Sequence, residues 1–318
     1  MNEWLERYSR REFIGVAATA AAVAMLPAGC KSGISRAREA GGRKLAKSSL
    51  ESGLFAAIGD DPYKMTLEAV KAAGGMKALV KKGDTVVIKP NIAWDRTPEQ
   101  AANTNPSVVR ALVEMCREAE AGQVYVFDRP CNEARRTYAR SGIAEAAKVA
   151  GAKVPFVNDE DLVKINIPDG KTLKKCFVHR MILEADVFIN VPIVKHHSAT
   201  VLTAGLKNMM GCMGGNRGMW HVGGLNQRIA DINTAIPADL TVMDAFRIIV
   251  RNGPTGGSLE DVREANTVAV GTDRVAADAY AATVFGVEPG EVESIRLAAE
   301  MGQGEIDLAK VEINEFEI

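Results

Sequence analysis

DTVVIKPN, at residues 84–91, decides the fold, because it predicts a buried strand of a sheet. Its β-branched centre follows Lys-Lys-Gly and stops at Pro90, which is typical of a strand with a loop at its carboxyl end. A helix is expected after that loop, because Pro106 stands at a first-turn position and apolar residues recur at helical spacing as far as Cys116. A strand followed by a helix in this way indicates a parallel sheet.

The rest of the chain largely repeats this alternation. Strands are predicted at residues 124–127, 154–157, 163–167, 175–179, 187–191, 240–243 and 267–270, with an edge strand at 311–318; helices are predicted at 142–150, 201–210, 227–236, 274–285 and after Pro289. The runs between 163 and 191 have no long helices between them, which indicates antiparallel strands or a mixed sheet. We therefore expect an α/β fold with a mixed, mainly parallel sheet, flanking helices and a glycine-rich central loop.

The composition is that of a globular protein without a dominant charge. The chain has 318 residues and is 47% hydrophobic, enough for a sizeable core, and we expect residues 51–318 to form a single α/β domain. It carries 39 basic and 40 acidic side chains, so no overall field would attract nucleic acid or anionic lipid. Nucleic-acid binding is therefore not expected.

The amino-terminal segment has the pattern of an export signal. Residues 9–14, SRREFI, contain the paired arginines of a twin-arginine signal, and an apolar run that is too short to span a membrane follows to Leu26. Residues 1–30 are therefore predicted to engage the twin-arginine export machinery, which would deliver the protein to the periplasm or cell envelope. Residues 31–50, rich in Lys, Arg, Gly and Ser, are expected to be a linker.

Residues 26–30, LPAGC, resemble a lipoprotein processing site, and two outcomes are open. In one, Cys30 becomes the acylated first residue and anchors the protein; in the other, cleavage at a nearby small residue releases a free protein. Contact with the membrane is expected only through the signal or this lipid.

The remaining cysteines do not predict a cofactor. Four of them follow Cys30, they are scattered, and no C-x-x-C pair occurs: Cys116, Cys131, Cys176 and Cys212. Buried thiols are the expected state of these residues, with one or two disulfides as the alternative. Their spacing does not support an iron–sulfur cluster.

The stretch VPIVKHHSATVLTAGLKNMMGCMGGNRGMWH, residues 191–221, carries three of the four histidines and several cations. Ligands of open α/β sheets bind outside the carboxyl ends of strands, where several polar residues of this chain are expected to meet. A carboxylate or phosphate site is predicted from four cations and two neutral donors, namely Lys89, Lys195, Lys207, Arg217, Asn91 and Asn208. His197, Lys195 and Asp244 are the candidate catalytic residues, and His197 or His221 is expected to move a proton near neutral pH.

A metal site is the alternative interpretation of the same stretch. His196 and His197 are neighbours on an extended segment, so they should face opposite sides and not bind one ion together. His196, His221 and Asp128 are the candidate ligands for a divalent metal such as Zn, Mn or Fe, with Asp244 as a further carboxylate. Methionines 209, 210, 213 and 219 are more typical of core packing than of Cu(I) binding.

The chain resembles the family catalogued as domain of unknown function 362 over about residues 84–286. The resemblance is carried by KPN at 89–91, VPIVKHH at 191–197, LKNMMG at 206–211, Asp244, Gly253-Pro254 with Gly256, and GTD at 271–273 with Ala276 and Asp278. It implies shared roles for Lys89, Asn91, Lys195, His197, Lys207, Asn208, Asp244 and Asp278, but no settled reaction. Some relatives carry ferredoxin-like cysteine repeats, which this chain lacks.

Two hypotheses of function follow. The first is an exported enzyme that acts on a small carboxylate or phosphate, with metal assistance as an option. The second is a non-catalytic protein of the cell envelope that binds a metal or anion, or serves an iron–sulfur-related redox system. Turnover of such a substrate by the purified protein would separate them.

Replacing Arg10 and Arg11 by Lys should leave the precursor in the cytoplasm, because the paired arginines are the feature that the export receptor reads. Fractionation and immunoblotting would measure this. Cys30→Ala is the companion variant, which should abolish lipid labelling if Cys30 is acylated. Unchanged export of the double-lysine variant would contradict the twin-arginine assignment.

Overall fold

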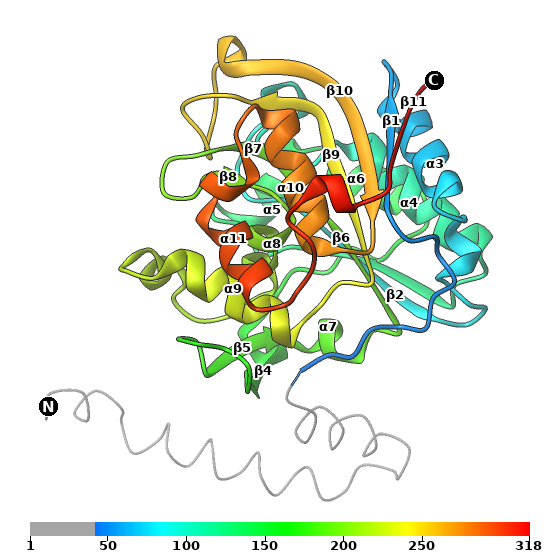
Figure 1. Ribbon diagram of the computed structural model, residues 1–318. Coiled ribbons are helices and arrows are strands. Elements are labelled where there is room, and N and C mark those ends of the chain that lie inside the picture. The colour runs from blue at the N-terminus through cyan, green and yellow to red at the C-terminus, as the bar shows by residue number, and fades with distance from the viewer. Residues whose placement is uncertain (1–41) are drawn as a thin grey trace, which may run out of the picture. The chain divides into compact units, whose positions relative to one another are not determined.

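The computed structural model describes residues 42–318, in which a large mixed sheet carries helices on both faces (Figure 1). The predicted signal, its paired arginines and Cys30 lie outside the described residues. Gly41–Ile318 form one compact unit.

The central sheet has nine strands and is mainly parallel. Its order is β11 (Ile313–Glu317), β1 (Leu54–Ile58), β10 (Val262–Gly271), β9 (Leu240–Ile249), β6 (Val187–Val191), β2 (Thr85–Pro90) and β3 (Gln123–Val126); β7 (Ile193–His197) pairs with β9 and with β8 (Val201–Thr203). Five neighbouring pairs run parallel and three antiparallel, which confirms the predicted mixed, mainly parallel sheet. The carboxyl-terminal strand lies at an edge, as its alternating pattern predicted.

Strand β2 explains why the apolar residues 86–88 are consecutive. Val86 and Ile88 point into the core beneath one helical layer, whereas Val87 packs with Phe127 and Phe188 on the opposite face. All three valine and isoleucine side chains are fully buried. A strand covered on both faces has no polar side, and therefore lacks the alternation of a half-exposed strand.

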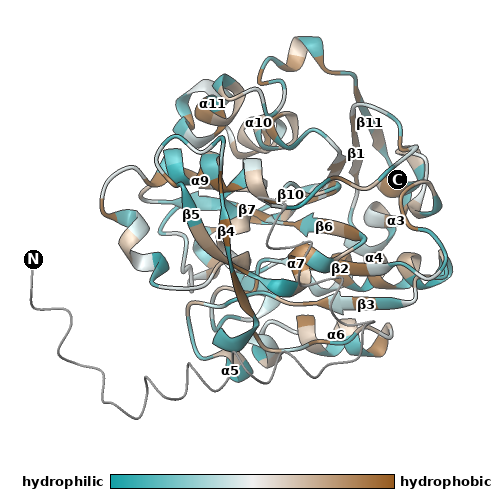
Figure 2. Ribbon diagram, turned by 90° about the horizontal axis from the view of Figure 1, so that it is seen from below, coloured by the Kyte–Doolittle hydropathy of each residue, from teal (hydrophilic) through white to brown (hydrophobic). Residues whose placement is uncertain are grey.

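The helices cover the sheet in two layers, which Figure 2 shows on either side of the apolar strands. One layer holds α3 (Pro62–Ala72), α4 (Pro106–Glu118) and α6 (Ile143–Val149); the other holds α8 (Gly205–Asn208), α9 (Leu225–Ala235), α10 (Arg274–Phe285) and α11 (Glu293–Glu300). The short helix α5 (Ala134–Arg140) lies between β3 and α6, and α7 (Arg180–Glu184) connects β5 to β6. Of the helices within residues 42–318, none is long and apolar enough to cross a membrane.

Local signals explain where the main helices begin. Asn105 caps α4 by accepting a hydrogen bond from the Ser107 backbone N–H, and Pro106 occupies the first turn. Asp273 caps α10 in the same way, through the N–H groups of Val275 and Ala276. Helices were predicted over both segments, the first of them from Pro106 and the apolar spacing that follows it.

Two predicted elements are wrong. Residues 154–157 form no strand, because Pro155 has no N–H to donate to a ladder, and only Lys153 makes an isolated bridge. Residues 201–210 are not one helix: Val201–Thr203 pair with β7 as strand β8, followed by the single turn α8 and a 3-10 helix at Met209–Cys212. Pairing with β7 outweighs the local helical pattern.

The strand predicted at 240–243 is longer than expected. It continues as β9 to Ile249, because β10 pairs with it along most of its length. Asp244 therefore lies within a strand and not at its carboxyl end.

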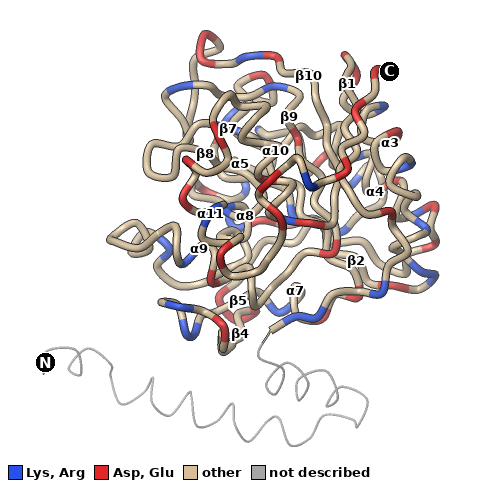
Figure 3. The backbone as a smooth tube through the Cα atoms, viewed as in Figure 1, with Lys and Arg blue, Asp and Glu red and all other residues tan. Residues whose placement is uncertain are grey.

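The expected antiparallel strands form a separate small sheet. Strand β4 (Leu162–Asn166) pairs antiparallel with β5 (Lys175–His179), and Ile165 and Val178 pack on the main sheet beside Phe127. Basic and acidic residues are interspersed over the described part of the chain, as Figure 3 shows, in agreement with the near-zero formal charge.

The carboxyl-terminal part of the predicted linker belongs to the fold. The Arg43 side chain is 2% exposed and forms an ion pair with Asp239, which is 1% exposed. The Asp239 carboxylate also accepts hydrogen bonds from the N–H groups of Ala46 and Phe188, at 2.6 and 2.7 Å. These contacts fasten the segment after residue 42 to β6 and β9, so it is not a free tether.

Arg43→Ala should lower the free energy of unfolding by about 3 to 5 kcal/mol, because it leaves the Asp239 carboxylate buried without its partner. Urea denaturation would measure the loss. Lys82→Ala is the control: it removes an exposed ion pair with Glu120, which should contribute less than about 1 kcal/mol. Equal, small effects of both variants would contradict the structural role of Arg43.

Candidate functional site

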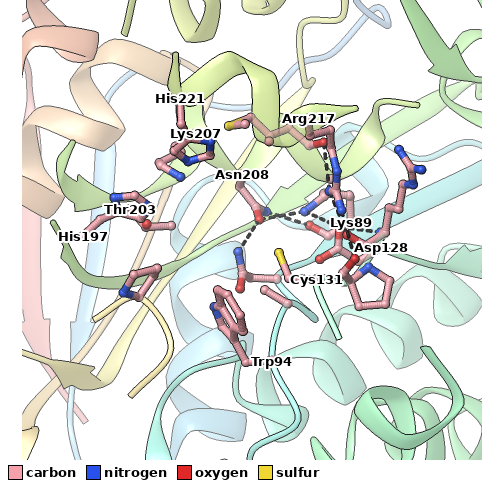
Figure 4. A pocket seen from close by; sticks show the side chains of 18 of the residues that line it. Lys89, Trp94, Asp128, Cys131, His197, Thr203, Lys207, Asn208, Arg217 and His221 are labelled. Atoms are coloured by element: carbon pink, nitrogen blue, oxygen red, sulfur yellow. Dashed lines mark hydrogen bonds and ion pairs between the residues drawn. The ribbon is translucent and has the colours of Figure 1, made fainter. Parts of the chain in front are cut away.

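A cavity of about 460 Å³ lies beside the carboxyl ends of β2 and β3, next to β7 and α8. Its walls carry five cationic side chains and one carboxylate: Lys89, Arg129, Lys195, Lys207, Arg217 and Asp128. His197 and His221 complete one side, and Figure 4 shows them with Thr203 and Lys207 across Asn208 from Lys89 and Asp128. The cavity therefore has an excess of positive charge.

The Lys89–Asp128 ion pair joins β2 to the loop after β3. The Lys89 Nζ and Asp128 Oδ1 atoms are 2.9 Å apart, and the two side chains are 1% and 3% exposed. Asp128 also accepts hydrogen bonds from the N–H groups of Ile92 and Arg129. Gly211 is required beside this pair, because a Cβ there would lie 1.8 Å from Asp128 Oδ1.

Asn208, at the end of α8, connects the polar groups of three segments. Its Oδ1 accepts hydrogen bonds from Lys89 Nζ at 2.7 Å and from Asn91 Nδ2 at 3.0 Å. Its Nδ2 donates to Asn190 Oδ1 and to the Lys89 carbonyl. Both ends of the buried amide are thus satisfied, and the side chain has one fixed orientation.

Lys195 is a buried ammonium without a carboxylate partner. Its Nζ donates to Asn91 Oδ1 at 3.0 Å and to the Ala102 carbonyl, and the residue is 1% exposed. Burial, reinforced by the nearby Lys207 charge, lowers the pKa of Lys195 to about 7. The side chain can therefore exchange a proton near neutral pH.

Lys207 faces the cavity from α8, and within residues 42–318 its ammonium makes no hydrogen bond or ion pair. Burial lowers its pKa to about 8; the Cys131 thiol opposes this shift and Arg217 adds to it. Asp278 positions α8 by accepting hydrogen bonds from the N–H groups of Gly205 and Leu206, at 2.6 and 2.9 Å. Asp278 is therefore a positioning residue that faces neither solvent nor the cavity.

His197 and His221 stack beside Lys207, with ring centroids 6.1 Å apart. His197 Nδ1 accepts a hydrogen bond from the Ala199 N–H, so its Nε2 carries the proton. Burial lowers the pKa of His197 to about 3, with help from the Lys207 charge. The expectation that His197 titrates near neutral pH is wrong, because the neutral ring is strongly favoured in this cationic, buried place.

The two arginines form walls of the cavity and are held by backbone carbonyls. Arg217 donates to the carbonyls of Arg129 and Pro130, at 2.8 and 2.9 Å. Arg129 donates to those of Met213 and Gly215. They fix the glycine-rich loop and add positive charge.

Two candidate residues do not reach the cavity. Asp244 is fully buried and accepts hydrogen bonds from the N–H groups of Asn105 and Phe246, so it does not face the cavity in which its catalytic role was predicted. His196 points away from His197, as predicted, and its Nδ1 accepts from the Gly253 N–H. It therefore does not join His221 and Asp128, and the described part of the chain holds no group of three or more His, Cys, Asp or Glu suited to a metal ion.

Cys131 and Arg129 are cavity residues that the sequence did not reveal. Cys131 is exposed and free, whereas the other three described cysteines are buried, so the expectation of four buried thiols is wrong. The only signal in the sequence for Cys131 and Arg129 was that both follow Asp128 at the end of a strand. Trp94 also lines the cavity from the loop after β2.

The fold and this cavity define a mixed α/β protein with a positively charged cavity at the carboxyl ends of parallel strands. The chain belongs to the family described as domain of unknown function (DUF362), whose model matches residues 86–283. The resemblance drawn from its motifs is thereby confirmed.

Known proteins show similarity over most of this chain. A thylakoid-associated protein of Synechocystis sp. is 28% identical over 242 residues, which cover 72% of this chain and 71% of that protein. The lactate racemase apoprotein of Thermoanaerobacterium thermosaccharolyticum has a TM-score of 0.44 at 12% identity, covering 72% of this chain and 56% of that one. A Thermotoga maritima protein of known structure has a TM-score of 0.42 at 13% identity, with coverages of 76% and 60%. This chain thus spans less than two thirds of either solved chain.

Lys195→Met should change how stability depends on pH. Between about pH 7 and 10 the unfolded chain keeps Lys195 protonated whereas the folded protein does not, so wild-type stability rises with pH through this group. Relative to the variant, the wild-type free energy of unfolding should rise by about 1.4 kcal/mol per pH unit in that window.

Urea titrations at several pH values would measure this difference. Lys71→Met, at an exposed lysine, should leave the pH dependence unchanged. A wild-type advantage over Lys195→Met that is constant with pH would contradict the lowered pKa.

Proposed function

We propose that this protein binds a small molecule with a carboxylate or phosphate group in the central cavity, and acts on it as an enzyme. The observation that carries the proposal is the charge of the walls: five cations face one carboxylate, which is already paired with Lys89. The Lys207 side chain is only partly exposed and its ammonium has no partner within residues 42–318, and a bound anion would supply one.

The size and chemistry of the cavity support a small ligand. About 460 Å³ is within the range of small-molecule sites, which extends from roughly 300 to 1,000 Å³. Lys207 offers charge-assisted hydrogen bonds, and the Nε2–H of His197 is a neutral donor on the same side. The side chains of Trp94 and Met210 form an apolar part of the cavity wall.

Catalysis is proposed because two lysines can change protonation near neutral pH. The pKa values of Lys195 and Lys207, about 7 and 8, suit groups that accept a proton during a reaction. His197 would hydrogen-bond to the substrate as a neutral ring and would not act as the acid. Asp244 has no part in this proposal.

We also propose that the protein acts in the periplasm or cell envelope. The twin-arginine pattern at residues 9–14 supports export, with Cys30 as the point of lipid attachment if it is processed there. The relative whose name places it at the thylakoid supports a location at a membrane. Localisation of the full chain tests this part independently of the cavity.

Lys207→Ala should weaken binding of inorganic phosphate or a small carboxylate by about 1.5 to 3 kcal/mol, because a charge-assisted hydrogen bond is lost. Isothermal titration calorimetry would measure it, and affinity should fall as ionic strength rises. Lys71→Ala, at an exposed lysine, is the matched control and should bind as wild type does.

Equal affinities of the wild type and Lys207→Ala for all anions tested would overturn the anion site. Turnover of a bound carboxylate or phosphate ester, lost in Lys195→Met, would establish the enzyme. Binding without turnover would favour the non-catalytic alternative.

A further inference from the structure

Lys207 differs from the other cations of the cavity in what its ammonium contacts. Lys89 is paired with Asp128, and Lys195 donates to Asn91 and Ala102. Both arginines donate to backbone carbonyls. Among residues 42–318 no acceptor meets the Lys207 Nζ, although its backbone is held on α8 by the contacts of Asp278. It is a positioned amine facing open space.

We propose that Lys207 is a nucleophile that captures a small 2-oxo acid as a Schiff base in this cavity. The inference rests on the proposed function, because it places the anionic ligand in the same cavity. It adds a substrate class, a compound with a carbonyl next to a carboxylate, and a covalent role for one residue.

The step balances without an oxidant or reductant. The lone pair of the neutral Lys207 amine forms a bond to the carbonyl carbon as the C=O π bond breaks, and one N–H proton passes through solvent to the carbonyl oxygen to give a neutral carbinolamine. A proton from solvent then converts the hydroxyl into water, the C–O bond breaks as the nitrogen lone pair forms the C=N bond, and the last N–H proton returns to solvent. Carbon and nitrogen keep their overall oxidation states.

The surroundings supply what this step needs. Burial holds the pKa of Lys207 near 8, so at pH 7 it has on the order of a hundred times more free amine than an ordinary lysine. The Nε2–H of His197 can donate to the carbonyl oxygen, because Nδ1 is occupied by the Ala199 N–H. Lys195 and Arg217 face the same space and attract the carboxylate.

Lys195 fits the nucleophile role less well, although its pKa is also lowered. Its Nζ already donates to two acceptors and the residue is 1% exposed. A covalent bond there would break both contacts. The geometry therefore favours Lys207 as the reacting amine and Lys195 as the group that exchanges protons.

Reductive trapping tests the inference on the purified full-length chain. Pyruvate and sodium cyanoborohydride should produce one adduct by intact-mass spectrometry, and peptide mapping should place it on Lys207. Its rate should exceed that at exposed Lys71 on the order of a hundredfold at pH 7, and should level off above about pH 8. The preference for pyruvate over acetone should exceed that of free Nα-acetyl-lysine by roughly tenfold, because the cavity also binds the carboxylate.

Lys207→Arg separates this inference from the proposed function. Arginine keeps the charge but forms no Schiff base, so phosphate affinity should fall less in Lys207→Arg than in Lys207→Ala, whereas both variants should lose the adduct. Adducts spread evenly over surface lysines, or an undiminished adduct in Lys207→Arg, would overturn the covalent role and leave anion binding intact. If phosphate binding is also indifferent to Lys207→Ala, the proposed function fails with it.

Discussion

The buried ion pair between Lys89 and Asp128 is the interaction on which the site depends. It joins β2 to the loop that follows β3, and it is close enough to Gly211 that no other residue would fit there. Asn208 binds the same ammonium, so α8 is fixed to the sheet at this point. Removing either charge would leave the other buried and unpaired, at a cost of several kcal/mol.

Because that pair is neutral overall, it leaves the remaining cations of the cavity uncompensated. Burial lowers the pKa values of both Lys195 and Lys207, and the Lys207 charge adds to the shift at Lys195. Burial, with help from the Lys207 charge, also keeps His197 unprotonated. The chemistry of the cavity thus follows from one placement: a single carboxylate, already paired, among five cations.

Much of the fold was predictable because its signals are local. The apolar run of β2, the Asn105 and Pro106 start of α4, and the Asp273 cap of α10 each lie within a few residues. Lys89, Asn91 and Lys195, which were expected to meet at strand ends, line one cavity. The helix predicted over residues 201–203 was wrong because these residues pair with β7. The position predicted for Asp244, at the end of a strand, was wrong because β9 continues beyond it in its pairing with β10. No residue near Cys131 in the sequence indicates that its loop lines the cavity. The low pKa of His197 arises from its burial and from the Lys207 charge, and both depend on the folded structure.

The cavity holds an uncompensated positive charge at Lys207. Anomalous diffraction from crystals grown in sodium bromide tests it most directly, because bromide reports where an anion settles without assuming a substrate. An anomalous peak is expected inside the cavity, within hydrogen-bonding distance of the Lys207 Nζ atom. Bromide sites confined to the outer surface, with ordered water alone beside Lys207, would contradict it.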